Sequence, residues 1–105
     1  MHDPVRSSRS EDPQVADLIE HFTVSLAERV DELQDAESKR DLGTLRTLSH
    51  VLGVNALELG FELLAASATE VEGYCLAGDE DAVRKALVDL TEISKRIRTT
   101  HRGAV

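Results

Sequence analysis

Apolar residues recur along most of the chain at intervals of three and four positions, which is the repeat of an amphipathic helix. Four such stretches predict helices over residues 12–39, 41–59, 61–77 and 79–98. Their apolar positions are Val15, Leu18, Ile19, Phe22, Leu26, Val30 and Leu33; Leu45, Leu48, Leu52, Ala56 and Leu59; Phe61, Leu64, Ala68, Val71 and Cys75; and Val83, Ala86, Leu87, Leu90, Ile93 and Ile97. No stretch alternates as a half-buried strand does. Because short connections favour antiparallel neighbours, the pattern predicts an all-α, antiparallel up-and-down four-helix bundle.

Capping residues and glycines mark the ends of these helices. Asp12 followed by Pro13 is typical of a helix start, with the aspartate as cap and the proline at the first helical position. Asp41 is a candidate cap for the second helix, and Gly60 predicts a stop or sharp turn after it. Residues outside this pattern are polar and aperiodic. The predicted organisation is therefore a flexible tail over residues 1–11, one domain over 12–99, and a second tail over 100–105.

Composition narrows the range of partners. The 105 residues carry a net charge of −8, and an acidic surface repels nucleic acid and anionic membranes, so neither is expected as a partner. Aromatic residues make up only 3% of the chain, too few to form base-stacking platforms. One cysteine excludes an internal disulfide and fits a reducing compartment, and no apolar run approaches the roughly 18 residues of a membrane span. A cytoplasmic location is expected.

The second predicted helix places a histidine away from the core. At about 100° per residue, His50 lies roughly 140° from Leu45, opposite the apolar stripe. His50 is therefore expected to be exposed in the middle of the helix. The same outer face is predicted to carry Arg46, Thr47, Gly53, Val54 and Leu57.

This outer face lacks the Lys and Glu residues of an ordinary solvated helix. Exposed apolar residues around a polar reactive group indicate a docking surface, and Leu63 of the third helix points away from its own stripe and could join it. A glycine in an exposed helix interior costs about 1 kcal/mol relative to alanine, and close approach of a partner would explain Gly53. The alternatives are that Gly53 packs on another helix, that Leu63 marks an oligomer contact, and that His50 is an ordinary surface residue.

The segment LRTLSHVLGVNALELG, residues 45–60, resembles the phosphoacceptor segment of histidine-containing phosphotransfer (HPt) domains. That family's pattern is approximately His-x-Leu-Lys-Gly-Ser-(Ser/Ala), with a further glycine ten residues after the histidine. In an ungapped alignment, His50, Leu52, Ala56 and Gly60 match. The layout of residues 13–98 agrees as well, including the Ala-x-x-x-Glu stretch that ends at Glu72. The resemblance implies a four-helix bundle with His50 as the phosphoacceptor.

The chain departs from the family pattern directly after the histidine. Gly53 stands at the position of the family's lysine, Val54 at that of its glycine, and Asn55 at that of its serine. The family's lysine lies near the phosphate, and its glycine leaves room for the partner. Arg46, one turn before His50, is the candidate replacement for the positive charge, and Gly53 is the candidate for the room.

The resemblance implies a phosphoryl carrier between receiver-domain aspartates in a two-component phosphorelay. Such a carrier is a monomer without kinase activity and without a cofactor of its own, because Mg²⁺ and the acidic pocket belong to the receiver. Two alternatives stay open: a degenerate HPt-like bundle that binds a receiver or another protein without carrying phosphate, and a helical dimerisation module.

Other chemistry finds little support in the residues. No two histidines are four positions apart and no Glu-x-x-His motif occurs, so no metal site is predicted. The chain has no glycine-rich phosphate loop. Cys75 falls on the apolar stripe of the third helix and is expected to be a core residue.

Overall fold

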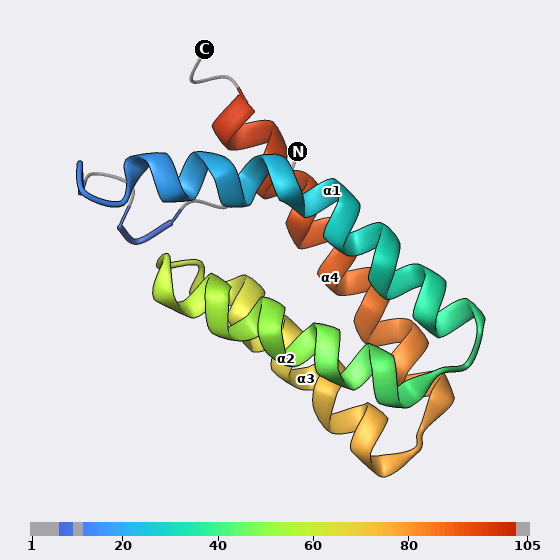
Figure 1. Cartoon of the computed structure of the whole chain (residues 1–105). Coiled ribbons are helices and arrows are strands. Elements are labelled where there is room, and N and C mark those ends of the chain that lie inside the picture. The colour runs from blue at the N-terminus through green and yellow to red at the C-terminus, as the bar shows by residue number, and fades with distance from the viewer. Residues whose placement is uncertain (1–6, 10–11, 103–105) are drawn as a thin grey trace.

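The computed structural model describes residues 7–9 and 12–102, which form four helices. These are α1 (Ala16–Ser38), α2 (Leu42–Glu58), α3 (Glu62–Ala77) and α4 (Glu80–Arg102). Consecutive helices run in opposite directions, and α4 returns along α1 (Figure 1). Each helix packs on its neighbours in the chain and α4 closes the ring with α1, so the predicted all-α, antiparallel four-helix bundle is confirmed. Within the described residues, no helix has the length and apolar character needed to cross a membrane.

The core is built mainly from aliphatic side chains, as the scarcity of aromatic residues requires. Leu26, Leu45, Leu64 and Val83, one from each helix, are completely buried. Almost all of the predicted apolar stripe is buried, but Leu18 is 55% exposed, because it lies at the edge of the α1 stripe in the first turn of the helix. Burial of this continuous apolar surface is the main force that holds the four helices together.

The two phenylalanines of the chain stack at one end of the core. The rings of Phe22 and Phe61 stack with their centroids 5.5 Å apart, which joins α1 to the residue that precedes α3. The guanidinium carbon of Arg29 lies 5.5 Å from the centroid of the Phe22 ring, within the range of a cation–π contact. This end of the bundle is therefore held by ring contacts as well as by aliphatic packing.

The helix starts show one confirmed cap and one wrong prediction. The Asp41 carboxylate accepts a hydrogen bond from the backbone N–H of Thr44 at 3.1 Å, so Asp41 caps α2 as predicted. Asp12 does not cap α1. Its carboxylate accepts from the N–H of Gln14 at 2.9 Å and closes a separate turn, so α1 begins at Ala16 rather than at Asp12–Pro13.

Residues 7–9 pack against the turn between α2 and α3, which differs from the flexible tail expected there. The backbone N–H of Ser8 donates to the carbonyl of Gly60 at 2.7 Å, and Nη1 of Arg9 donates to the carbonyl of Glu58 at 2.7 Å. The Ser7 hydroxyl donates to the carbonyl of Leu59. The last carbonyls of a helix have no partner within the helix, and this segment supplies donors to them. The remaining residues predicted for this tail, 1–6 and 10–11, lie outside the described residues.

The turn between α2 and α3 depends on a glycine. A separate difference from the prediction concerns the end of α4. Gly60 has φ +83°, a left-handed conformation that favours glycine, and α2 ends at Glu58, two residues before this predicted turn. The helix α4 continues to Arg102, whereas the sequence predicted a tail from residue 100. No glycine or proline interrupts the chain between Glu80 and Arg102, so nothing local stops the helix there. Residues 103–105 lie outside the described residues.

Candidate functional site

The helices α2 and α3 pack closely because small residues face each other between them. A Cβ at Gly53 would lie 3.4 Å from Cβ of Ala68 and 3.7 Å from the carbonyl oxygen of Ala65. Gly53 is buried, so its predicted place on the exposed outer face is wrong. The 3.6-residue repeat separates the core side of a helix from its outer side. It does not show which flank a neighbouring helix covers, and Gly53 lies on the flank that α3 covers.

His50 lies on the outer edge of this contact, in the middle of α2. Its side chain is 61% exposed, as the sequence predicts, and its Nδ1 lies 3.2 Å from Oε1 of Glu72 on α3. The Glu72 side chain is only 24% exposed, so the acceptor is the better-anchored partner of the two. In a neutral imidazole, a carboxylate partner holds the proton on Nδ1, which leaves the lone pair on Nε2. The arrangement therefore orients the ring and makes Nε2 the nucleophilic atom.

Arg46 and Cys75 extend this pair along the two helices. Cys75 is buried in α3 as predicted, and burial is the main cause that raises the pKa of its thiol. The positive charge of Arg46 acts in the opposite direction on this pKa, and the negative charge of Glu72 raises it further. Both charged groups thus act on the pKa of the same buried thiol. We refer to Arg46, His50, Glu72 and Cys75 as the His50 cluster.

The predicted docking residues do not all lie on the same surface. Thr47, Val54 and Leu57 are exposed on α2 with His50, as predicted. Leu63 is exposed as well, but it is nine positions from Glu72, which places it about 180° around α3. Its predicted place beside Val54 and Leu57 is therefore wrong, because it faces away from the His50 cluster.

Glu72 is the site residue that the sequence did not reveal as a partner of His50. It lies 22 positions after the histidine, and no short motif joins the two. The signal that could have found it is the turn at Gly60. In an antiparallel helix pair, residues at similar distances from the turn face each other, and His50 and Glu72 lie ten positions before and twelve positions after Gly60.

No metal site is evident in the part of the chain that the structure describes. No group of three or more His, Cys, Asp or Glu side chains is close enough there to hold a metal ion. The His50 cluster itself contains one imidazole, one carboxylate, one buried thiol and one cation. This set suits a positioned nucleophile better than a metal ligand sphere.

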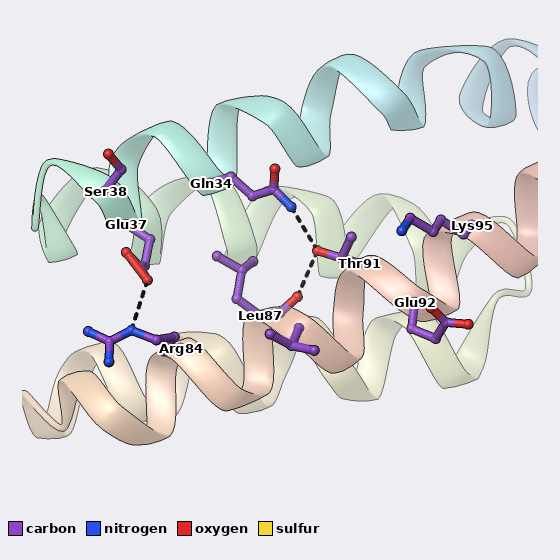
Figure 2. A pocket seen from close by; sticks show the side chains of 9 residues that line it. Gln34, Glu37, Ser38, Arg84, Leu87, Thr91, Glu92 and Lys95 are labelled. Atoms are coloured by element: carbon purple, nitrogen blue, oxygen red, sulfur yellow. Dashed lines mark hydrogen bonds and ion pairs between the residues drawn. The ribbon is translucent and has the colours of Figure 1, made fainter.

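A groove of about 390 Å³ lies on the opposite side of the bundle, between α1 and α4. Figure 2 shows Gln34 and Glu37 of α1 facing Thr91 and Arg84 of α4. The Gln34 amide donates to the Thr91 hydroxyl at 3.2 Å, and Nε of Arg84 lies 3.5 Å from the Glu37 carboxylate. Gln34 and Glu37 are thus paired with α4 across the groove, and none of the residues described as lining it is His or Cys.

No protein-family model, curated protein or solved structure matches this chain. The chemistry and exposure of the His50 cluster are therefore the indications of function.

Proposed function

We propose that this protein carries a phosphoryl group on His50 between receiver-domain aspartates, as a histidine-containing phosphotransfer protein. The observation that supports the proposal most directly is the exposed imidazole of His50, which is hydrogen-bonded through Nδ1 to Glu72. A carrier of this kind needs an accessible nucleophile at a protein surface rather than an enclosed pocket, because its substrate is the phosphorylated aspartate of another protein.

The chemistry requires only the atoms of the ring and the incoming phosphoryl group. The lone pair on Nε2 attacks the phosphorus of the aspartyl phosphate, an N–P bond forms, and the P–O bond to the aspartate breaks with release of its carboxylate. The ring becomes positively charged, and the Glu72 carboxylate at Nδ1 stabilises that charge. The aspartate carboxylate of a second receiver then attacks the same phosphorus. The N–P bond then breaks and the neutral imidazole returns.

Arg46 is the proposed source of positive charge for the phosphoryl oxygens. It lies one turn before His50 on α2 and is exposed. Its positive charge acts against the burial that raises the pKa of the Cys75 thiol on α3. Phosphoryl transfer is promoted mainly by positioning and by neutralisation of charge, so one cation beside an oriented imidazole suffices for a carrier. Arg46→Ala is expected to shorten the lifetime of the phosphohistidine and to slow transfer, and unchanged values for both would remove this role.

We further propose that this protein is a cytoplasmic monomer. Its proposed partners are the receiver domains of response regulators or hybrid histidine kinases. The single buried cysteine fits a reducing compartment. A monomer leaves the surface around His50 free for each receiver in turn.

The test is transfer of labelled phosphate from receiver domains encoded in the same genome. Each receiver is phosphorylated on its aspartate, purified from the donor and mixed with the full chain. The expected product is a phosphoprotein that is labile to acid and stable to alkali, and His50→Gln abolishes it. Absence of label with every receiver would refute the carrier function.

A second candidate is a bundle that binds a receiver without carrying phosphate. The observation that favours it is Gly53, which stands where the resembled family has its lysine and is buried against α3. This candidate predicts that receivers bind the chain without labelling it, and that His50→Gln binds them with unchanged affinity.

A further inference from the structure

We infer that Gly73 of α3 is a contact point for the receiver domain, because it leaves the space that the receiver surface fills when its aspartate reaches His50. This inference rests on the proposed phosphotransfer and identifies a determinant of partner docking on α3, outside the helix that carries the histidine.

Gly73 has no explanation within the fold. Outside its own helix backbone and chain neighbours, no atom lies within 4 Å of the position that a Cβ would take. Its φ is not positive, in contrast to Gly60 and Gly78, and it has no close packing contact of the kind that explains Gly53. A glycine in an exposed helix interior destabilises the helix relative to alanine. The missing side chain therefore lowers the stability of the helix without a compensating contact among the described residues.

The place of Gly73 connects it with the reactive atom. It follows Glu72 directly, and the Glu72 carboxylate lies 3.2 Å from Nδ1 of His50. Residues three and four positions apart are neighbours on a helix surface, so Leu76 lies beside Gly73, and Leu76 is 67% exposed. The open space over Gly73 thus lies about 100° around α3 from Glu72, on the exposed side of the helix, and an exposed apolar side chain borders it.

A receiver that phosphorylates His50 must cover this space. Its aspartyl phosphate has to come within about 3–3.5 Å of Nε2 before the N–P bond forms. A stable protein interface covers about 800 Å² on each partner, so a receiver centred on His50 extends over the adjoining turns of α2 and α3. Leu57 of α2, two turns after His50, and Leu76 of α3, one turn after Glu72, are both more than half exposed. They give the receiver apolar contacts around a polar centre.

The experiment compares two sources of phosphate in Gly73→Ala and Gly73→Leu. Phosphoramidate is a small donor that needs no docking surface, whereas phosphorylated receiver domains need one. The readout is the ratio of the receiver-dependent labelling rate of His50 to the phosphoramidate-dependent rate. We expect this ratio to fall about tenfold or more for Gly73→Leu and by a smaller factor for Gly73→Ala. We also expect the melting temperature of Gly73→Ala to rise above that of the native chain. Thr99→Leu, which adds an apolar side chain at an exposed position of α4, is the matched control and keeps the native ratio.

The outcomes separate the inference from the proposed function. A native ratio in both Gly73 variants would overturn the inference while the carrier function stands. An equal loss with both donors would also overturn it, because the effect would then be on His50 itself rather than on docking. If the native chain is labelled by no receiver, the proposed function fails and the inference fails with it.

Discussion

The two flanks of the bundle, α2 with α3 and α1 with α4, use their polar side chains in opposite ways. The α1–α4 groove encloses about 390 Å³, and within it Gln34 bonds to Thr91 and Glu37 pairs with Arg84 (Figure 2). The α2–α3 surface leaves one nitrogen of His50 available and one carboxylate to orient it. An oriented imidazole, rather than the volume of a hollow, therefore distinguishes the α2–α3 surface from the α1–α4 groove.

The packing beneath the two flanks explains the difference. Gly53, Ala65 and Ala68 let α2 and α3 approach closely, so a side chain at the edge of one helix reaches the other. Between α1 and α4 the facing side chains are long, and Arg84 must reach across the groove to meet Glu37. Small residues at a helix contact therefore bring reactive groups together at its rim, whereas long ones fill the contact with their own pairs.

The largest difference between the flanks is expected for loss of the nucleophile. His50→Gln removes Nε2, and labelling by phosphorylated receivers is expected to fall to background. Arg84→Gln changes the opposite flank, breaks its ion pair with Glu37 and is expected to leave labelling unchanged. Both variants are compared by transfer rate, with circular dichroism to verify the fold. A loss of labelling in Arg84→Gln equal to that in His50→Gln would erase the distinction between the flanks.

A matched pair of carboxamides tests the orienting role of Glu72. Glu72→Gln keeps an acceptor for Nδ1 but removes the charge that stabilises the ring, so the transfer rate is expected to fall about tenfold. Glu37→Gln makes the same change in the α1–α4 groove and is expected to transfer at the native rate. Stability should change little in either variant, because both ion pairs are partly exposed. A native rate for Glu72→Gln would show that the hydrogen bond does not assist transfer.

Stability measurements distinguish the two exceptional glycines of the α2–α3 flank. Gly53→Val forces extra atoms into the contact with Ala68 and is expected to lower the free energy of unfolding by about 1–3 kcal/mol. Gly73→Ala fills open space and is expected to raise this free energy by about 1 kcal/mol. Denaturant unfolding monitored by circular dichroism measures both values. The same sign of change in the two variants would contradict the different roles assigned to these glycines.

The ion pair of the α1–α4 groove is expected to contribute little. A double-mutant cycle with Glu37→Gln and Arg84→Gln should give a coupling free energy of about 0.5 kcal/mol, because the Arg84 side chain is mostly exposed. The coupling should decrease when salt is added, since exposed charges are screened. A coupling that is large and insensitive to salt would show that this groove is a more rigid element than its exposure suggests.

The smallest effect is expected at the start of the helix that carries His50. Hydrogen bonds from the side chain and backbone of Thr44 lower the pKa of the Asp41 carboxyl. Because the folded pKa is below its usual value, the charged cap contributes stability at neutral pH and loses it as the pH falls below about 4. Asp41→Asn retains a capping oxygen but does not titrate, so its unfolding free energy should vary less with pH in this range. An identical pH dependence in the two proteins would exclude this contribution.

The fold was predictable because its signal is local. Periodic apolar positions, the Asp41 cap and the Gly60 turn predicted four helices and three connections, and the structure confirms this order. The exposure of His50 followed from the same periodicity. The prediction that Asp12 caps α1 was wrong because an aspartate before a helix can close a turn of its own instead of capping the helix.

The candidate site was only partly predictable because its signal is long-range. Glu72 meets His50 through the packing of two helices, and no property of either residue alone reveals the contact. Gly53 was assigned to the outer face because periodicity does not show where α3 lies. Residues 7–9 illustrate the same limit, since their partners are backbone carbonyls about fifty positions away.

The short turn at Gly60 has a consequence for how the site forms. All members of the His50 cluster, together with Gly73, lie between Leu42 and Ala77, within one helical hairpin. Contacts inside a hairpin join residues that are near in the chain, so they require less loop-closure entropy than the contact of α1 with α4. We therefore expect the reactive surface to assemble early as the chain folds, before the two ends of the chain are brought together.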